Sequence, residues 1–225
     1  MIVDSMTFEE VVNEYKKDHK TAFDKITKWE LNNQHKIRRV MIKKKPKSLY
    51  YVYSTTYKTK NHNNFIIEAY ACNYSHWKKE GLLYSVIMDF QYHGGRNLLM
   101  AGCDNSEYIW ICPHFIQRYN ERFLNSNEAN VEITFLHRNQ HIVHVNNASE
   151  NYKSSRFGYV NDGVVLGHYI LPNTFFYGTF LNRNMLFDSQ INISDEVYID
   201  YKEYLKTDFR LDVEDINYQT PPKRA

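Results

Sequence analysis

The chain has 225 residues, 43% of them hydrophobic and 16% aromatic, and its 28 Lys and Arg nearly balance 26 Asp and Glu. This size and composition can build a core, which excludes global disorder, and the apolar stretches fall short of the ~18 to 20 residues that span a membrane. The net charge of +2 neither requires nor excludes an anionic partner. Three cysteines and an N-terminus without signal-peptide features predict a reduced, cytoplasmic protein that makes no membrane contact.

The N-terminal segment has the pattern of an amphipathic helix. Thr7 and Glu10 form a capping-box pattern, and apolar residues follow at helical spacing, which predicts a helix near residues 7–32. Seven Lys and Arg residues then lie between Lys36 and Lys47. Such a run is typical of a solvated helix end or loop, and it would also attract a phosphate backbone.

The middle of the chain changes to short β-rich runs bounded by Asn, Gly or Lys. They predict strands at residues 49–57, 65–71, 82–90, 97–101 and 108–111. Pro113 suits the first position of a helix, because its missing N–H costs nothing there. We therefore expect a helix over 113–124.

The second half predicts further strands. Alternation at 131–135 and a return at 141–145 indicate two of them, and Asn161-Asp162-Gly163 is typical of a tight hairpin turn. That turn separates strands at 157–160 and 164–170, and another strand follows at 174–181. A helix is expected at 194–205.

The order of these elements predicts an α+β fold with mainly antiparallel sheet. It has helices at the start, near 113–124 and near the C-terminus, and lacks the regular alternation of a parallel α/β sheet. We expect residues 1–105 to hold the N-terminal helix and the strand meander, which need not be a separate domain. Residues 106–210 would form a helix-plus-sheet unit, and 211–225 a flexible tail.

The segment most suggestive of chemistry is the helix beginning at Pro113. At about 100° per residue, one side of this helix carries His114, Arg118, Glu121 and Arg122. A neighbouring apolar sector, expected to be buried, contains Phe115, Tyr119 and Phe123. Histidine transfers protons near neutral pH, guanidinium groups hold phosphate, and a glutamate orients either one or acts as a base. The alternative is an amphipathic helix in which Arg118 and Glu121 form a surface ion pair.

This segment and two strands after it resemble small toxin-type ribonucleases of the barnase/RelE-like superfamily. The similarity rests on the His-x3-Arg-x2-Glu-Arg helix starting at His114, the Gly-Val-Val strand at 163–165 and the Thr-Phe-Leu strand at 179–181. It covers about residues 108–190. The resemblance implies a helix packed on a four-stranded antiparallel sheet whose concave face binds RNA, and catalysis without a metal. His114 and Arg118 match the helix positions, and Thr179 matches the polar residue of the last strand.

No cofactor or metal is predicted. His137 and His141 have no acidic or cysteine companion at ligand spacing, and neither a phosphate loop nor a dinucleotide fingerprint occurs in the sequence. Tyrosines at 50, 51, 53 and 57 could stack on bases, but such residues are more often amphipathic strand residues with a buried ring.

Three functions remain open at this point. The first is a metal-independent endoribonuclease of toxin or phage-defence type, with RNA as substrate and an antitoxin as a possible protein partner. The second is a non-catalytic interaction or mobile-element accessory protein. The third is a nucleic-acid-binding module using residues 36–47 and the tyrosines. The sequence assigns no oligomeric state. The useful spatial observation is whether His114, Arg118 and Thr179 converge on one open, basic surface.

Overall fold

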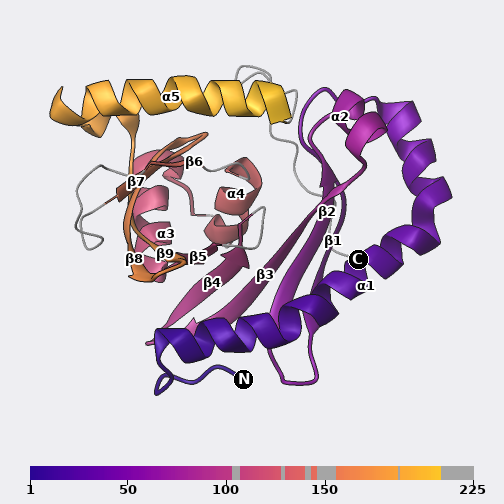
Figure 1. Ribbon diagram of the computed structural model, residues 1–225, viewed down its shortest axis with the longest axis horizontal. Helices are drawn as coiled ribbons and strands as arrows, with labels where there is room; N and C mark the ends of the chain where they lie inside the picture. Colours follow the sequence, from indigo (N-terminus) through magenta and orange to yellow (C-terminus); the bar gives the residue numbers. More distant parts are fainter. Residues whose placement is uncertain (103–106, 128–129, 140–142, 146–155, 187, 209–225) are drawn as a thin grey trace. The chain divides into compact units, whose positions relative to one another are not determined.

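The computed structural model describes residues 1–102, 107–127, 130–139, 143–145, 156–186 and 188–208 (Figure 1). The chain forms two compact units. One contains Met1–Gly94, Leu98–Met100 and Lys206–Ala225, and the other contains Gly95–Asn97 and Ala101–Leu205. Strand β4 (Gly95–Ala101) is thus shared between them. The predicted tail at 211–225 lies outside the described residues.

Helix α1 (Phe8–Lys44) is the longest element of the first unit. Its capping box is present, with Thr7 accepting from the Glu10 backbone N–H and Glu10 accepting from the Thr7 backbone N–H. Ile37 and Met41, one turn apart, are buried near its end, and the helix stops where Lys45 adopts a left-handed conformation before Pro46. The predicted end near residue 32 was wrong, because no Gly or Pro interrupts residues 33–45 and Lys and Arg are good helix formers.

The sheet of the first unit consists of β1 (Tyr50–Lys58), β2 (Asn64–Ala71) and β3 (Leu83–Tyr92), paired antiparallel in that order. Helix α2 (Tyr74–Glu80) connects β2 to β3 and was not predicted. In Figure 1, α1 runs beside this sheet. Tyr15 of α1 packs on Phe65 and donates to the Val86 carbonyl at 3.0 Å, while Trp29 stacks on Tyr53. These contacts fix the helix on the strands.

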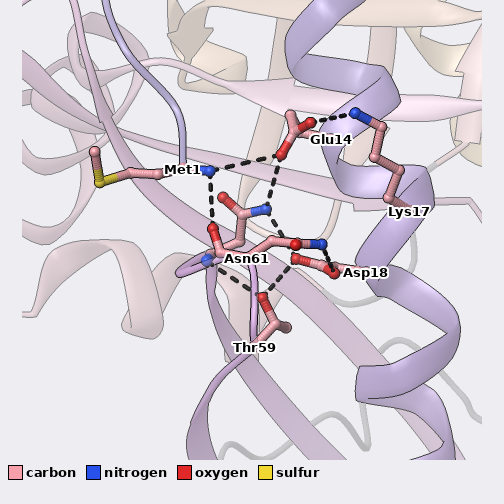
Figure 2. Close-up of polar contacts among 7 residues, drawn as sticks. Met1, Glu14, Lys17, Asp18, Thr59 and Asn61 are labelled. Carbon is pink, nitrogen blue, oxygen red and sulfur yellow. Dashed lines mark hydrogen bonds and ion pairs between the residues drawn. The ribbon is translucent and has the colours of Figure 1, made fainter.

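A polar cluster joins α1 to the turn between β1 and β2 (Figure 2). Asp18 is 4% exposed and accepts hydrogen bonds from Thr59 at 2.5 Å, Asn61 at 2.8 Å and Asn63 at 2.9 Å. Glu14, one turn earlier, accepts from Lys17 at 2.5 Å. A carboxyl group can be buried when hydrogen bonds replace its contacts with water, so these donors explain why Asp18 lies here.

The second unit combines one parallel strand pair with antiparallel pairs. Its strands follow the order β5-β9-β8-β7-β6, where β5 and β9 are parallel and the other neighbours are antiparallel. The strand bounds are Tyr108–Ile111 for β5, Val143–Val145 for β6, Arg156–Val160 for β7, Gly163–Leu171 for β8 and Thr174–Leu181 for β9. The α+β fold class with a mainly antiparallel sheet is confirmed.

Four helical segments accompany these strands. They are α3 (Pro113–Tyr119), which continues as a π-helical turn η1 (Asn120–Leu124), α4 (Val131–Arg138), the short helix η2 (Arg183–Met185) and α5 (Asp188–Asp208). Phe115 of α3 meets Phe135, Tyr177 and Phe180 with ring centroids 4.9 to 6.3 Å apart. Tyr201 of α5 packs on Tyr159 of β7. An aromatic core therefore holds α3, α4 and β9 together.

Two sequence predictions in this unit need correction. Residues 131–135 were expected to form a strand, yet they belong to α4, where Ile133, Phe135 and Leu136 are buried at helical spacing. Phe123 was expected to be buried with Phe115 and Tyr119, but it is only half-buried. It lies in the π-helical turn, whose wider winding rotates each following residue away from the α-helical register.

Candidate functional site

The helix with the predicted site residues starts at a close contact between Pro113 and β4. A Cβ built on Gly95 would lie 2.3 Å from Pro113 Cγ, so only glycine admits the proline ring at this distance. The helix then buries Phe115, Ile116 and Tyr119. The buried side fixes the rotation of α3, and His114, Gln117, Arg118 and Glu121 are left on the exposed or half-exposed side.

Arg118 and Glu121 form a surface ion pair. Arg118 Nη1 donates to Glu121 Oε2 at 2.7 Å, and Gln117 Nε2 donates to Glu121 Oε1 at 2.7 Å. The side chains of Arg118 and Glu121 are 38% and 42% exposed. The hydrogen bond from Gln117, followed by that from Arg118, lowers the pKa of Glu121. Ion pairs in this environment are weak and easily exchanged, so a phosphate can still compete for the guanidinium.

Arg122 points to a different group, because the π-helical turn carries it toward β9. Its Nη1 donates to the Phe180 carbonyl at 2.6 Å and to Thr179 Oγ1 at 3.4 Å. Both acceptors lie beyond Tyr177, the last residue of β9 that pairs with β5. Arg122 therefore extends the bonding of β9 past the end of its parallel partner.

The predicted site residues form two linked groups. Arg118 bonds to Glu121, and Arg122, the next residue along the helix, bonds to Thr179. His114 is exposed one turn before Arg118. The sequence left open whether His114, Arg118 and Thr179 converge, and in the structure the hydrogen bond to Thr179 comes from Arg122. On a helix, Cβ atoms four residues apart are about 5 to 6 Å from each other, which leaves His114 and Arg118 as neighbours on one face.

A buried polar network beneath this helix was not anticipated. Asp162, whose side chain is 3% exposed, receives a two-pronged hydrogen bond from Arg138 with both distances 2.8 Å. Tyr119 donates to the same carboxylate at 2.6 Å and Asn139 at 3.0 Å. Burial, together with the negative charge of Asp162, raises the pKa of Tyr119 well above its usual value. The sequence indicated Asp162 only as a turn residue, and nothing local shows that the turn clamps α3 to α4.

In the described part of the chain, no group of three or more His, Cys, Asp or Glu is placed to hold a metal ion. Cys72 and Cys112 are both buried, and the Cys112 thiol donates to the Tyr177 carbonyl. None of the described helices has the length and apolarity needed to cross a membrane.

Comparison with known proteins gives no assignment: no family model, no curated protein and no solved structure matches this chain.

Proposed function

We propose that the protein is a metal-independent endoribonuclease of toxin or phage-defence type. The observation that carries the proposal is the surface of α3, where His114 is exposed one turn from the half-exposed Arg118, on a helix whose next turn is bonded to Thr179 of β9. A proton-transfer group and a phosphate-binding group thus share one face beside the last strand.

The topology of the second unit gives independent support. Two helices, α3 and α4, are followed along the chain by the antiparallel meander β6-β7-β8-β9, and α3 packs on β9. The resemblance to barnase/RelE-like ribonucleases implies a helix on a four-stranded antiparallel sheet. The meander supplies those four strands, and the parallel strand β5 is an addition beside β9. A protein antitoxin as binding partner belongs to the same proposal.

The proposed reaction begins with attack of a ribose 2'-hydroxyl on the adjacent phosphate. His114 accepts the proton from the 2'-oxygen as the new O–P bond forms. The bond to the 5'-oxygen then breaks, and that oxygen leaves with a proton from solvent or from the imidazolium. Glu121 is the poorer base because its pKa is lowered by Gln117 and Arg118. It therefore orients Arg118, which stabilises the charge on the phosphate.

Arg122 and Thr179 have a positioning role in this scheme. Because Arg122 already donates to the Phe180 carbonyl, it holds the end of β9 against the helix. Thr179 then lies beside the helix face as the polar residue of the last strand.

The experiment is incubation of the purified chain with total RNA in EDTA. The wild type should cleave, and His114→Ala should lose most of this activity while remaining folded. His168→Ala is a matched control, since His168 is an exposed imidazole of the same unit that lies on β8. Loss of activity in the control but not in His114→Ala would contradict the proposed role.

A non-catalytic interaction protein is the second candidate. It is favoured by one observation, that Arg118 and Arg122 both have protein partners, a carboxylate and a backbone carbonyl. In that case α3 is a charged surface stripe, and folded wild-type protein leaves RNA intact with or without divalent ions.

A further inference from the structure

The charge of this chain is strongly segregated. Nine of its 28 Lys and Arg residues lie between Leu31 and Ile67, a stretch of the sequence that contains no Asp or Glu. The remaining 19 basic residues accompany all 26 acidic ones. The net charge of +2 therefore conceals one strongly basic stretch in a chain that is acidic elsewhere.

Most of this basic stretch lies on one regular element. The last two turns of α1 bury Ile37 and Met41, which fixes the rotation of the helix, and Lys36, Arg38, Arg39, Lys43 and Lys44 are all exposed. At about 100° per residue, Lys36, Arg39 and Lys43 fall on the side opposite the buried pair. Along the axis, Lys36 and Lys43 are about 10 Å apart at 1.5 Å per residue.

We propose that this outward face of α1, centred on Lys36, Arg39 and Lys43, binds the phosphate backbone of an RNA strand. Regularly spaced cations without intervening carboxylates match a chain of phosphates, and counterion release would supply the affinity. The choice of RNA as ligand rests on the proposed ribonuclease function. The surface would hold the substrate without reading its sequence, because only backbone charge is engaged.

An anionic membrane is less suited to this helix. An interfacial helix inserts an apolar face into the bilayer, with cations on the opposite side. In α1 the apolar residues Ile37 and Met41 are buried in the protein. The exposed apolar residues of this stretch, Val40 and Ile42, lie about 160° apart around the helix and are interspersed with cations, so they form no single apolar face. A phosphate backbone, which contacts only the charged groups, therefore fits this surface better than a bilayer, which needs an inserted apolar face.

The test measures binding of a fluorescent 2'-O-methyl RNA, which lacks the 2'-hydroxyl nucleophile and so cannot be cleaved. The logarithm of the binding constant is measured against the logarithm of the salt concentration, in the presence of EDTA. The triple variant Lys36→Ala/Arg39→Ala/Lys43→Ala should lower the magnitude of the slope by about 2, since each phosphate contact with a single strand contributes about 0.7. Alanine favours helix, so the variant should remain folded, which circular dichroism verifies.

The matched control is Lys20→Ala/Lys79→Ala/Lys206→Ala, which removes three exposed lysines from outside the stretch. Its slope should equal that of the wild type. An equal slope in both triple variants would overturn the proposal. The proposal would also be overturned if the wild type left the RNA unbound but bound phosphatidylserine vesicles or DNA of the same sequence. Because this probe reports binding alone, the surface can be disproved while cleavage stands, or the reverse.

Discussion

Arg122 is the predicted site residue whose bonds reach furthest from its own helix. Its hydrogen bond to the Phe180 carbonyl is charge-assisted, and Phe180 lies on β9 beyond the last residue that pairs with β5. Arg122→Ala should lower the free energy of unfolding by about 1 to 3 kcal/mol, because a partly buried carbonyl loses a charged donor. Urea denaturation measures this. Arg118→Ala serves as the control, and its ion pair is exposed enough that the midpoint should barely move.

A result in which Arg118→Ala destabilises the fold more than Arg122→Ala would contradict these assignments. It would mean that the surface pair, rather than the bond to β9, fixes the helix on the sheet.

Asp162 should matter more to stability than any residue of the exposed helix face. Asp162→Ala leaves Arg138 and Tyr119 without the buried carboxylate that they share. Breaking a buried pair costs roughly 3 to 5 kcal/mol, and the partial exposure of Arg138 places the expected loss near the lower end. Tyr119→Phe removes one donor to Asp162 and should cost about 1 kcal/mol. Urea denaturation measures both changes. Equal losses of unfolding free energy in Asp162→Ala and Tyr119→Phe would contradict the role of Asp162 in holding α3 to α4.

At the scale of single elements, β8 depends on a glycine in a bulge. A Cβ at Gly167 would lie 2.1 Å from the Phe176 carbonyl oxygen, next to a register shift between β8 and β9. Gly167→Ala must push the strands apart and should cost about 1 to 3 kcal/mol. Gly178→Ala is a fitting control, since its Cβ would meet the nearest atom at 3.4 Å, an ordinary contact. Similar melting temperatures for the two variants would contradict this account of the bulge.

The elements differ in how far the sequence could predict them. Strands β7, β8 and β9 agree with their predicted ranges to within one residue, because alternation and the Asn161-Asp162-Gly163 turn are local signals. Helix α4 was missed because its first five residues, 131–135, alternate between apolar and polar as a strand does. The packing of Phe135 on Phe115 and Tyr119, which are distant in the sequence, favours the helix. The sequence prediction ends α1 too early, because a run of cations such as that at residues 36–47 is equally typical of a helix end or a loop.

The candidate site shows the same division between local and distant information. The exposed side of α3 followed from helical spacing alone, since Phe115 and Tyr119 determine which way the helix faces. The hydrogen bond from Arg122 to Thr179 joins residues that are 57 positions apart in the sequence. In the network around Asp162, Tyr119 and Asp162 are 43 positions apart. Such partners depend on tertiary packing, which no local pattern encodes.

At the scale of the whole molecule, buried tyrosines should limit stability in alkali. Burial and the hydrogen bond to Glu107 raise the pKa of Tyr169 to about 12, and burial also raises the pKa of Tyr119 and Tyr177. A raised pKa in the fold contributes stability that is fully present below the unfolded value of about 10 and is lost as the pH rises through the folded value. We therefore expect unfolding to become easier above pH 10.

Ultraviolet absorbance of tyrosinate against pH checks this expectation. The buried tyrosines should ionise only above pH 10, in the same pH range in which the circular dichroism signal of the folded protein is lost. Complete ionisation at about pH 10, with the fold intact, would contradict the burial of these hydroxyl groups.

The central claim, RNA cleavage by 2'-hydroxyl attack without a metal, is tested most directly by the ends of the products. A labelled RNA oligonucleotide is incubated in EDTA with wild type, His114→Ala, Arg118→Ala and Arg118→Lys, and the fragments are analysed by mass. The account predicts 2',3'-cyclic phosphate ends from the wild type and none from His114→Ala. Arg118→Ala should be slowed about 100-fold or more, with little recovery in Arg118→Lys, because an ammonium cannot replace the guanidinium fork. Cleavage abolished by EDTA, or wild-type rates in folded Arg118→Ala, would contradict the account.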